Sequence, residues 1–598
     1  MLEQPEVPGA ELGGSRRDIV IWDWLGLSAA ATAGSIGAAA LAWRMNRIRP
    51  GYPGLLQLLL WITLALWIIT VSVVAAGSLR WEVRLRDIPR RVLDSWASPA
   101  RTWMVFSLGA AISLPLAALH TRVILGDSDS ARLLASLVYV QRHGPHYLVD
   151  TQANILPHLV LGPVVRVWGI PGGKALGIAL LIVLAGLVCV MAWRLSGATI
   201  AGVAAVLALL SCRAILERAV YLPMYPAMLV LGFGGVYLAY RSVTSSSRWR
   251  LGLALLAGLS LVASSEAHGL GFAFLVTPAL LPIALPFRQT LRRLVPVAGA
   301  TTLFYLPRVA LNLAEGGLRD FLSYRDEYWI TKGYLVEIQR QFWGLPSTKV
   351  GVMRYPLLWL HKTPRLFGWT ALLVLGLACV AFLLARGRLR WLAVAGLAIY
   401  MGPAIVRQAP LYPRYFSPLA VGAALAAGAA LPLMRDRISR GTWLIAPVLA
   451  ALFAMSVIAL GTMGRLAAVR ERQIVSGPYL ALAEIVNDGK GVIGARTAQL
   501  LFADSHIETY GTQFLEEREF VTYLTWPSDQ AVISMMKARN IGWAYVNPLL
   551  RRENRYNNTW LRPLGLRARH VKALEASPNF CLVFSEGGYK LYRLGGCR

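Results

Sequence analysis

The chain has 598 residues, of which 56% are hydrophobic, and it carries a formal net charge of +29 at pH 7. Its mean hydropathy of +0.52 and the apolar runs along most of its length exclude an ordinary soluble globular protein. The runs are helix-length and lack strict alternation of apolar and polar residues, which argues against an outer-membrane β-barrel. The sequence therefore predicts a polytopic α-helical membrane protein.

About thirteen transmembrane helices are expected, because apolar runs of about 17–25 residues are long enough to cross a bilayer. The candidate runs are 19–43, 54–77, 102–119, 155–169, 175–193, 198–213, 222–240, 249–263, 270–286, 294–312, 367–385, 390–406, 415–433 and 442–463. The first is too long for a signal peptide and lacks a clear cleavage site, so we interpret it as a retained anchor. The run 198–213, with its polar continuation "RAILERAVY", is expected to be re-entrant or broken. Four full crossings between 155 and 240 would otherwise conflict with the charges of the next connector.

Arginine is concentrated in connectors between the apolar runs, namely 78–101, 241–250, 287–293, 386–390 and 434–440. The positive-inside rule places such connectors in the cytoplasm. Loops 120–154 and 313–366, and the residues after about 464, then lie outside. Anionic membrane lipids, rather than nucleic acid, are the expected partners of the basic residues, since the sequence has no RNA-binding or zinc-finger signature.

The character of the sequence changes after about residue 464. Segments "GVIGA", "IGWAYVNP", "FCLVFS" and "YKLYRL" are typical of short strands, and "SDQAVISMMKARN" is typical of a helix between them. We therefore expect 1–101 to hold two extra helices and a basic loop, 102–463 the main membrane domain, and 464–598 a small extracytoplasmic α/β domain. Cys581 and Cys597 lie in this tail, where an oxidising compartment would allow a disulfide; the sequence leaves the pairing open.

Residues 126–134, "GDSDSARLL", place two aspartates just after a predicted span. A plain explanation is a helix start, in which Asp127 or Ser128 caps the helix and Asp129 favours its dipole. The following "ARLLASLVYVQRHG" is amphipathic and predicts a helix along the outer membrane surface. Two nearby carboxylates also have the chemistry to hold a divalent cation, so metal use by Asp127 and Asp129 stays open.

The loop contains Asp129, Arg132 and Gly144 and is followed by "NILPHL". In these residues it resembles the protein mannosyltransferase and aminoarabinose transferase group of the GT-C glycosyltransferases. Segments "YLPMYPAMLVLGFG" and "PLYPRYFSPLA" are similar to recurrent segments of that superfamily, and the resemblance extends loosely over about 100–460. The group usually has an acidic residue directly after the Asp, where this chain has Ser130. The resemblance implies a GT-C-like fold with a trailing outer domain, and a polyprenyl-phosphate sugar as donor.

Transfer from a lipid phosphate to a hydroxyl needs a base that takes the acceptor proton while the phosphate leaves. By register with the group, Asp129 is the expected base of an inverting displacement, and Asp127 is a helper, an acceptor-binding residue or a metal ligand.

The leaving phosphate needs positive charge near the outer interface. The candidates for this role are Arg414, Arg308 and His268, and the residues expected to line the substrate pocket are Arg132, His158, Glu266 and Tyr415. Plain alternatives stay open, with Arg414 as an interfacial anchor, His158 as a structural residue, and Glu266 and His268 as hydrated turn residues.

The sequence thus predicts a plasma-membrane glycosyltransferase that moves a hexose or pentose, such as mannose or arabinose, from a polyprenyl-phosphate donor to an acceptor hydroxyl outside the cell. The acceptor is a glycan, a lipid or a protein. The rival interpretations are a transporter or flippase of lipid-linked sugars, which would more often show internal repeats, and a noncatalytic scaffold of the cell envelope.

Overall fold

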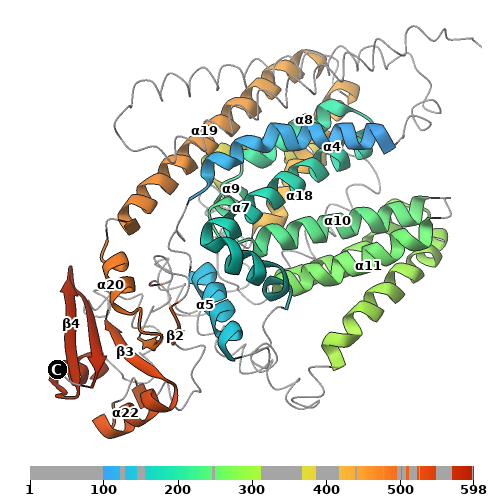
Figure 1. Ribbon diagram of the computed structural model, residues 1–598. Helices are drawn as coiled ribbons and strands as arrows, with labels where there is room; N and C mark the ends of the chain where they lie inside the picture. The colour runs from blue at the N-terminus through green and yellow to red at the C-terminus, as the bar shows by residue number, and fades with distance from the viewer. Residues whose placement is uncertain are drawn as a thin grey trace, which may run out of the picture.

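The computed structural model describes residues 99–121, 128–143, 155–245, 249–310, 367–384, 416–437, 441–475, 477–494, 500, 507–510, 522–523, 526–546, 569–595 and 597. These residues form a bundle of long helices and, beside it, a small unit built on a β-sheet (Figure 1). Of the predicted spans, 19–43, 54–77 and 390–406 lie outside the described residues, as does the whole of loop 313–366.

The bundle follows the predicted apolar runs. Its helices are α4 (Pro99–Ser113), η1 (Leu114–Leu119), α5 (Ser128–His143), α7 (Ile155–Ser196), α8 (Thr199–Leu210), α9 (Arg213–Ala219), α10 (Met224–Thr244), α11 (Arg250–Ala267), η2 (Gly269–Gly271), α12 (Phe272–Val276), η3 (Thr277–Leu280), α13 (Leu281–Ala284), a helix over 287–310, η4 (Trp369–Ala371), α16 (Leu372–Leu384), α18 (Ser417–Arg437) and α19 (Gly441–Val475). Within the described part, six helices are long and apolar enough to cross a membrane, or seven if α8 and α9 form one broken span.

Helix α7 covers the two predicted runs 155–169 and 175–193. Its backbone leaves helical geometry at Gly169 (φ 65°), so the runs form two helical segments that meet at a kink. Pro171 lies in the first turn of the second segment, where its missing amide costs no helical hydrogen bond. The predicted break in 198–213 is confirmed, since α8 and α9 meet at an angle of 71°. The segment 155–240 then holds three crossings, and the arginine-rich connector 241–250 returns to the side of the bundle where α4 begins.

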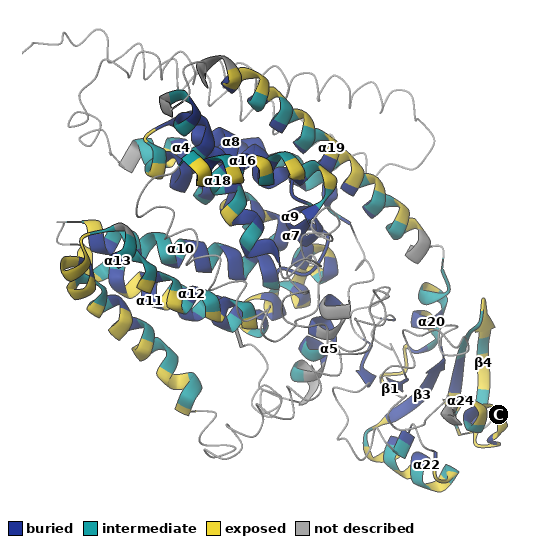
Figure 2. Cartoon of the chain, turned by 180° about the vertical axis from the view of Figure 1, so that it is seen from behind, coloured by how far each residue is buried: buried dark blue, intermediate teal, exposed yellow. Residues whose placement is uncertain are grey.

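Helix α8 is the centre of the bundle. All of its residues are buried, and Figure 2 shows it among dark-blue neighbours. Its small residues allow close approach: a Cβ added at Gly202 would lie 2.8 Å from the carbonyl oxygen and from Sγ of Cys189 on α7. On α18, a Cβ added at Gly428 would lie 2.4 Å from the carbonyl oxygen of Ala201. Cys189 and Cys212 are buried, free thiols.

Exposed tryptophans mark two levels along the helices. Trp103 and Trp249 stand near the starts of α4 and α11, whereas Trp168 stands at the bend of α7 and Trp369 at the start of η4. Tryptophan is enriched where a helix passes from hydrocarbon to head groups. The two pairs therefore mark the two interfaces of the membrane domain. We call the end with Trp168 the α5 end and the end with Trp103 the opposite end.

The C-terminal unit contains a five-stranded sheet in the order β2-β1-β3-β5-β4. Its elements are α20 (Tyr479–Ile485), β1 (Gly491–Ile493), β2 (Thr509–Tyr510), α22 (Asp529–Ala538), β3 (Ile541–Val546), α24 (Arg569–Ala576), β4 (Phe580–Glu586) and β5 (Tyr589–Leu594). Strands β1, β3, β4 and β5 and helix α22 coincide with the predicted segments, whereas the two-residue β2 was not predicted. The pairings β2–β1 and β1–β3 are parallel, and β3–β5 and β5–β4 are antiparallel. Cys581 and Cys597 form a disulfide, which fixes the chain after β5 to β4.

Helix α5 lies between the bundle and this unit. Its buried Leu134 and Leu137 belong to one hydrophobic cluster with Leu161 of α7 and Leu482 of α20. This burial explains the amphipathic pattern of α5, which the sequence analysis assigned to a membrane surface. The apolar face of α5 instead packs against protein, and its first turn is thereby fixed at the α5 end of the bundle.

The close contact between Gly202 and Cys189 predicts a specific loss of stability. The Gly202→Ala variant should lower the free energy of unfolding by about 1–3 kcal/mol, because the new methyl group overpacks α8 against α7. Gly422→Ala on α18 is the matched control, since its Cβ would meet no atom within 4 Å. Thermal unfolding of the purified protein in detergent measures both, and an unchanged midpoint for Gly202→Ala contradicts this packing.

Candidate functional site

The first turn of α5 is attached to the connection between α9 and α10. Ser130 is 2% exposed, and its Oγ accepts a hydrogen bond from the amide of Leu222 at 3.1 Å. Asp129 precedes Ser130 in this first turn. The start of the aspartate-bearing helix is therefore held against the residues that follow α9.

Helix α9 carries two buried charges of opposite sign. Glu217 and Arg218 are 7% and 3% exposed. Oε1 of Glu217 accepts from Nε of Arg213 at 2.5 Å, while its Oε2 lies 3.4 Å from Nη2 of Arg218. Two guanidinium groups thus share one carboxylate, and the group keeps a net positive charge.

The guanidinium of Arg218 is only partly satisfied. Its Cζ lies 4.7 Å from the ring centroid of Tyr221 and 5.1 Å from that of Tyr225, in cation–π geometry. Its Nε and Nη1 are buried and have no hydrogen-bond partner among the described residues. Buried donors of a charged group are costly to leave unpaired. The arrangement therefore has spare donors for an acceptor that comes from outside this part of the chain.

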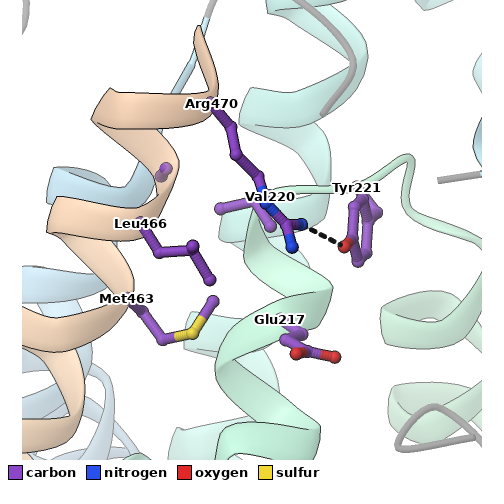
Figure 3. Close-up of a pocket in the computed structure, with 7 residues that line it drawn as sticks. Glu217, Val220, Tyr221, Met463, Leu466 and Arg470 are labelled. Atoms are coloured by element: carbon purple, nitrogen blue, oxygen red, sulfur yellow. Dashed lines mark hydrogen bonds between the residues drawn. The ribbon is translucent and has the colours of Figure 1, made fainter. Parts of the chain in front are cut away.

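A small pocket lies between α9 and α19, with an empty volume of about 210 Å³. It is lined by Glu217, Val220, Tyr221, Met463, Leu466, Ala467 and Arg470. Figure 3 shows the guanidinium of Arg470 directed at Tyr221, whose phenol oxygen accepts from Nη1 at 3.5 Å. Helix α19 contributes three apolar side chains and Arg470 to the pocket, and the other wall holds Glu217, Val220 and Tyr221. Arg470 is thus a further cation near Arg218, because both contact Tyr221.

Glu266 and Arg308, two predicted site residues, interact with each other. Glu266 of α11 lies 3.8 Å from Nε of Arg308, and both side chains are largely buried. Pairing is what a cation inside an apolar run requires. A carboxylate therefore already engages Arg308, which had been expected to hold the donor phosphate.

His268, directly after α11, contacts Tyr225. Its ring lies 4.3 Å from that of Tyr225, centroid to centroid. Its Nδ1 accepts a hydrogen bond from the amide of Leu270 at 3.1 Å, which leaves the ring oriented by the η2 turn. Tyr225 thus joins His268 to Arg218, and the predicted residue lies next to a cation that was not predicted.

The other predicted residues fall into two groups. His158 contacts Ser136 of α5, with 3.3 Å between Nε2 and Oγ, and so links α7 to α5 as the structural interpretation expected. Asp127, Arg414 and Tyr415 lie outside the described residues, and Asp129 and Arg132 are described only as backbone of α5. No group of three or more His, Cys, Asp or Glu suited to a metal ion occurs in the described part of the chain.

Sequence reasoning missed Arg218, Tyr221 and Tyr225. The signal was present in "RAILERAVY", because two adjacent ionisable residues inside an apolar segment indicate a functional position. The sequence analysis above took this segment only as the sign of a break in the helix. Ser130, treated as a departure from the family pattern, likewise proved to make a structural hydrogen bond.

No protein-family model matches this chain, and no curated protein matches it. Among solved structures, ArnT from Cupriavidus metallidurans bound to undecaprenyl phosphate has a TM-score of 0.53 at 14% identity, covering 83% of this chain and 98% of ArnT. The apo state of the same ArnT has a TM-score of 0.51 at 14% identity, with the same coverage of both chains. The archaeal oligosaccharyltransferase AglB from Archaeoglobus fulgidus has a TM-score of 0.47 at 12% identity, covering 83% of this chain and 74% of AglB.

This chain has the GT-C fold. The resemblance inferred from the outer-loop motif is thereby confirmed at the level of fold, although the exact number of helices is not. In this fold, Ser130, Arg218, Tyr225 and His268 all lie at the α5 end of the bundle.

Removal of the Ser130 hydroxyl tests the attachment of α5. Ser130→Ala should lower the free energy of unfolding by about 1–3 kcal/mol, because the buried amide of Leu222 loses its acceptor. The same variant should speed hydrogen exchange of that amide, as measured by mass spectrometry of the peptides around 222. Ser130→Thr keeps the hydroxyl and should remain close to the parent. Equal exchange rates in the parent and in Ser130→Ala contradict the attachment.

Proposed function

We propose that the protein is an integral-membrane glycosyltransferase that moves a sugar from a polyprenyl-phosphate donor to an acceptor hydroxyl at the α5 end. The observation that carries the proposal is the hydrogen bond between Ser130 and Leu222 on a GT-C fold. It holds the Asp129-bearing turn beside a buried arginine with spare donors. The similar ArnT structure is bound to undecaprenyl phosphate, which supports a lipid phosphate as the donor group.

In this mechanism Asp129 is the base. It takes the proton of the acceptor hydroxyl while that oxygen attacks the anomeric carbon and the bond to the lipid phosphate breaks, in one inverting displacement. Asp127 assists, as a helper, an acceptor-binding residue or a metal ligand. One carboxylate is sufficient for such a displacement, so a divalent cation is an option rather than a requirement.

Arg218 supports the departing phosphate. The positive charge of Arg213 and Arg218 exceeds that of their shared partner Glu217, and Nε and Nη1 of Arg218 have no partner among the described residues. Charge-assisted hydrogen bonds from a guanidinium suit a phosphate that gains negative charge as it leaves. His268 joins this group through Tyr225, and Arg414 keeps its predicted role at the outer interface.

The α5 end is proposed to face outside the cell. The described parts of the arginine-rich connectors, at 241–245, 249–250, 287–293 and 434–437, lie at the opposite end, as the positive-inside rule demands of a cytoplasmic face. The disulfide between Cys581 and Cys597 in the C-terminal unit supports an oxidising compartment on the α5 side. The protein is then a plasma-membrane enzyme whose acceptor is a glycan, a lipid or a protein in the cell envelope.

Transfer of a radiolabelled sugar by the purified full-length protein tests this function. A panel of synthetic polyprenyl-phosphate hexoses and pentoses is offered with envelope acceptors. Asp129→Asn should lower kcat by at least about 10²-fold through loss of the base. Arg218→Gln should lower it by about 10²-fold through loss of leaving-group stabilisation. Arg250→Gln, which removes an exposed arginine at the opposite end, is the matched control and should keep the parent's rate.

Each rival interpretation has its own result in the same experiment. Transfer that survives Asp129→Asn moves the base elsewhere, with Asp127→Asn as the next variant. A parent that transfers nothing but carries labelled lipid across liposome membranes is a flippase. A parent that does neither and binds envelope polymer is a scaffold.

A further inference from the structure

Three arginines converge at the opposite end of the bundle, far from α5 along α7. Arg101 lies in the first turn of α4, Arg194 in the last turn of α7 and Arg241 in the last turn of α10. The guanidinium carbon of Arg101 lies 5.2 Å from the ring centroid of Trp193, and that of Arg194 lies 4.5 Å from the same ring. We call Arg101, Arg194 and Arg241 the arginine cluster.

The helices that carry the arginine cluster supply no opposite charge. Neither α4, α7 nor α10 contains an aspartate or a glutamate. Arg194 interacts repulsively with both Arg101 and Arg241. Like charges this close destabilise each other, the more so where protein and lipid exclude water. An anion between them would remove the repulsion.

Arg194 has hydrogen-bonding capacity left. Its Nη2 donates to Oγ1 of Thr102 at 2.8 Å. Its Nε is buried without a hydrogen-bond partner among the described residues. Arg194 therefore has a spare charged donor, and the guanidinium of Arg101 lies against the same indole ring. Guanidinium donors of this kind suit a phosphate.

The depth of the arginine cluster identifies the kind of phosphate. Trp193, beneath the two guanidinium groups, is 5% exposed, whereas Trp103 and Trp249 nearby along the chain are 66% and 67% exposed. Exposed tryptophans mark the level of the lipid head groups. A phosphate at this level belongs to a lipid of the adjacent leaflet rather than to a solute.

We propose that the arginine cluster binds the phosphate of an anionic phospholipid, at a site separate from the proposed donor site. Trp193 orients Arg101 and Arg194, and the phosphate neutralises their repulsion, so that the bound lipid ties the ends of α4, α7 and α10 together. This proposal does not depend on glycosyl transfer, because it concerns the opposite end of the bundle and is measured as lipid binding.

Native mass spectrometry of the delipidated full-length protein tests the site. Phosphatidylglycerol is titrated into the detergent-solubilised protein, with phosphatidylcholine and inorganic phosphate as separate arms. The parent should bind phosphatidylglycerol in preference to phosphatidylcholine, and inorganic phosphate should not displace it. Arg194→Gln should weaken phosphatidylglycerol binding about fivefold, the effect of one interfacial arginine.

Two further variants make the result decisive. Arg241→Gln should show a loss similar to that of Arg194→Gln, and it keeps the contacts of Arg194 with Thr102 and Trp193 in place should Arg194→Gln fold poorly. Arg250→Gln removes the same charge from an exposed position at the same end and should bind like the parent. Equal binding by the parent, Arg194→Gln and Arg241→Gln overturns the proposal. Displacement of the lipid by inorganic phosphate also overturns it, since the arginine cluster would then hold a free anion.

Discussion

The hydroxyl of Ser130 and the amide of Leu222 are both buried, and their hydrogen bond joins segments that lie 92 residues apart in the sequence. The backbone after α9 has left helical geometry, so the Leu222 amide has no partner within its own helix and depends on this hydroxyl. The same contact fixes where α5 begins, and α5 in turn supports the C-terminal unit through a common hydrophobic cluster. The bundle, α5 and the C-terminal sheet are therefore positioned around one polar contact, beside the charges of α9.

The two ends of the bundle use arginine in different ways. At the α5 end, Arg213 and Arg218 share Glu217, and Arg308 has Glu266. At the opposite end, the helices bearing Arg101 and Arg194 have no carboxylate, and both cations lie against one indole ring. Carboxylates at the first end keep the cations fixed while leaving one of them with spare donors. Their absence from the helices at the second end makes that surface strongly basic, as expected where it meets anionic lipid.

Much of the architecture follows from the sequence, because apolar length, charge asymmetry and strand alternation are local signals. They predicted the break between α8 and α9 and four of the five strands. Gly169 and Pro171 likewise give a local signal for the kink that divides α7 between the two predicted runs. The site was harder to predict, because it depends on contacts between distant segments. The resemblance placed Asp129 at the start of an outer helix, but no spacing rule could show that Arg218 lies beside Tyr225 and His268.

The shortness of α8 has a consequence for access. With 12 residues, it is about 18 Å long at the usual rise per residue, whereas the hydrocarbon core of a bilayer is about 30 Å thick. The bend that follows lies beside η4, because Oγ1 of Thr370 donates to the carbonyl oxygen of Ser211 at 2.6 Å, and so it lies near the level that Trp369 marks. A short hydrophobic span is accommodated by local thinning of the bilayer. Bilayer thickness then becomes a determinant of how readily a lipid phosphate in the membrane reaches Arg218.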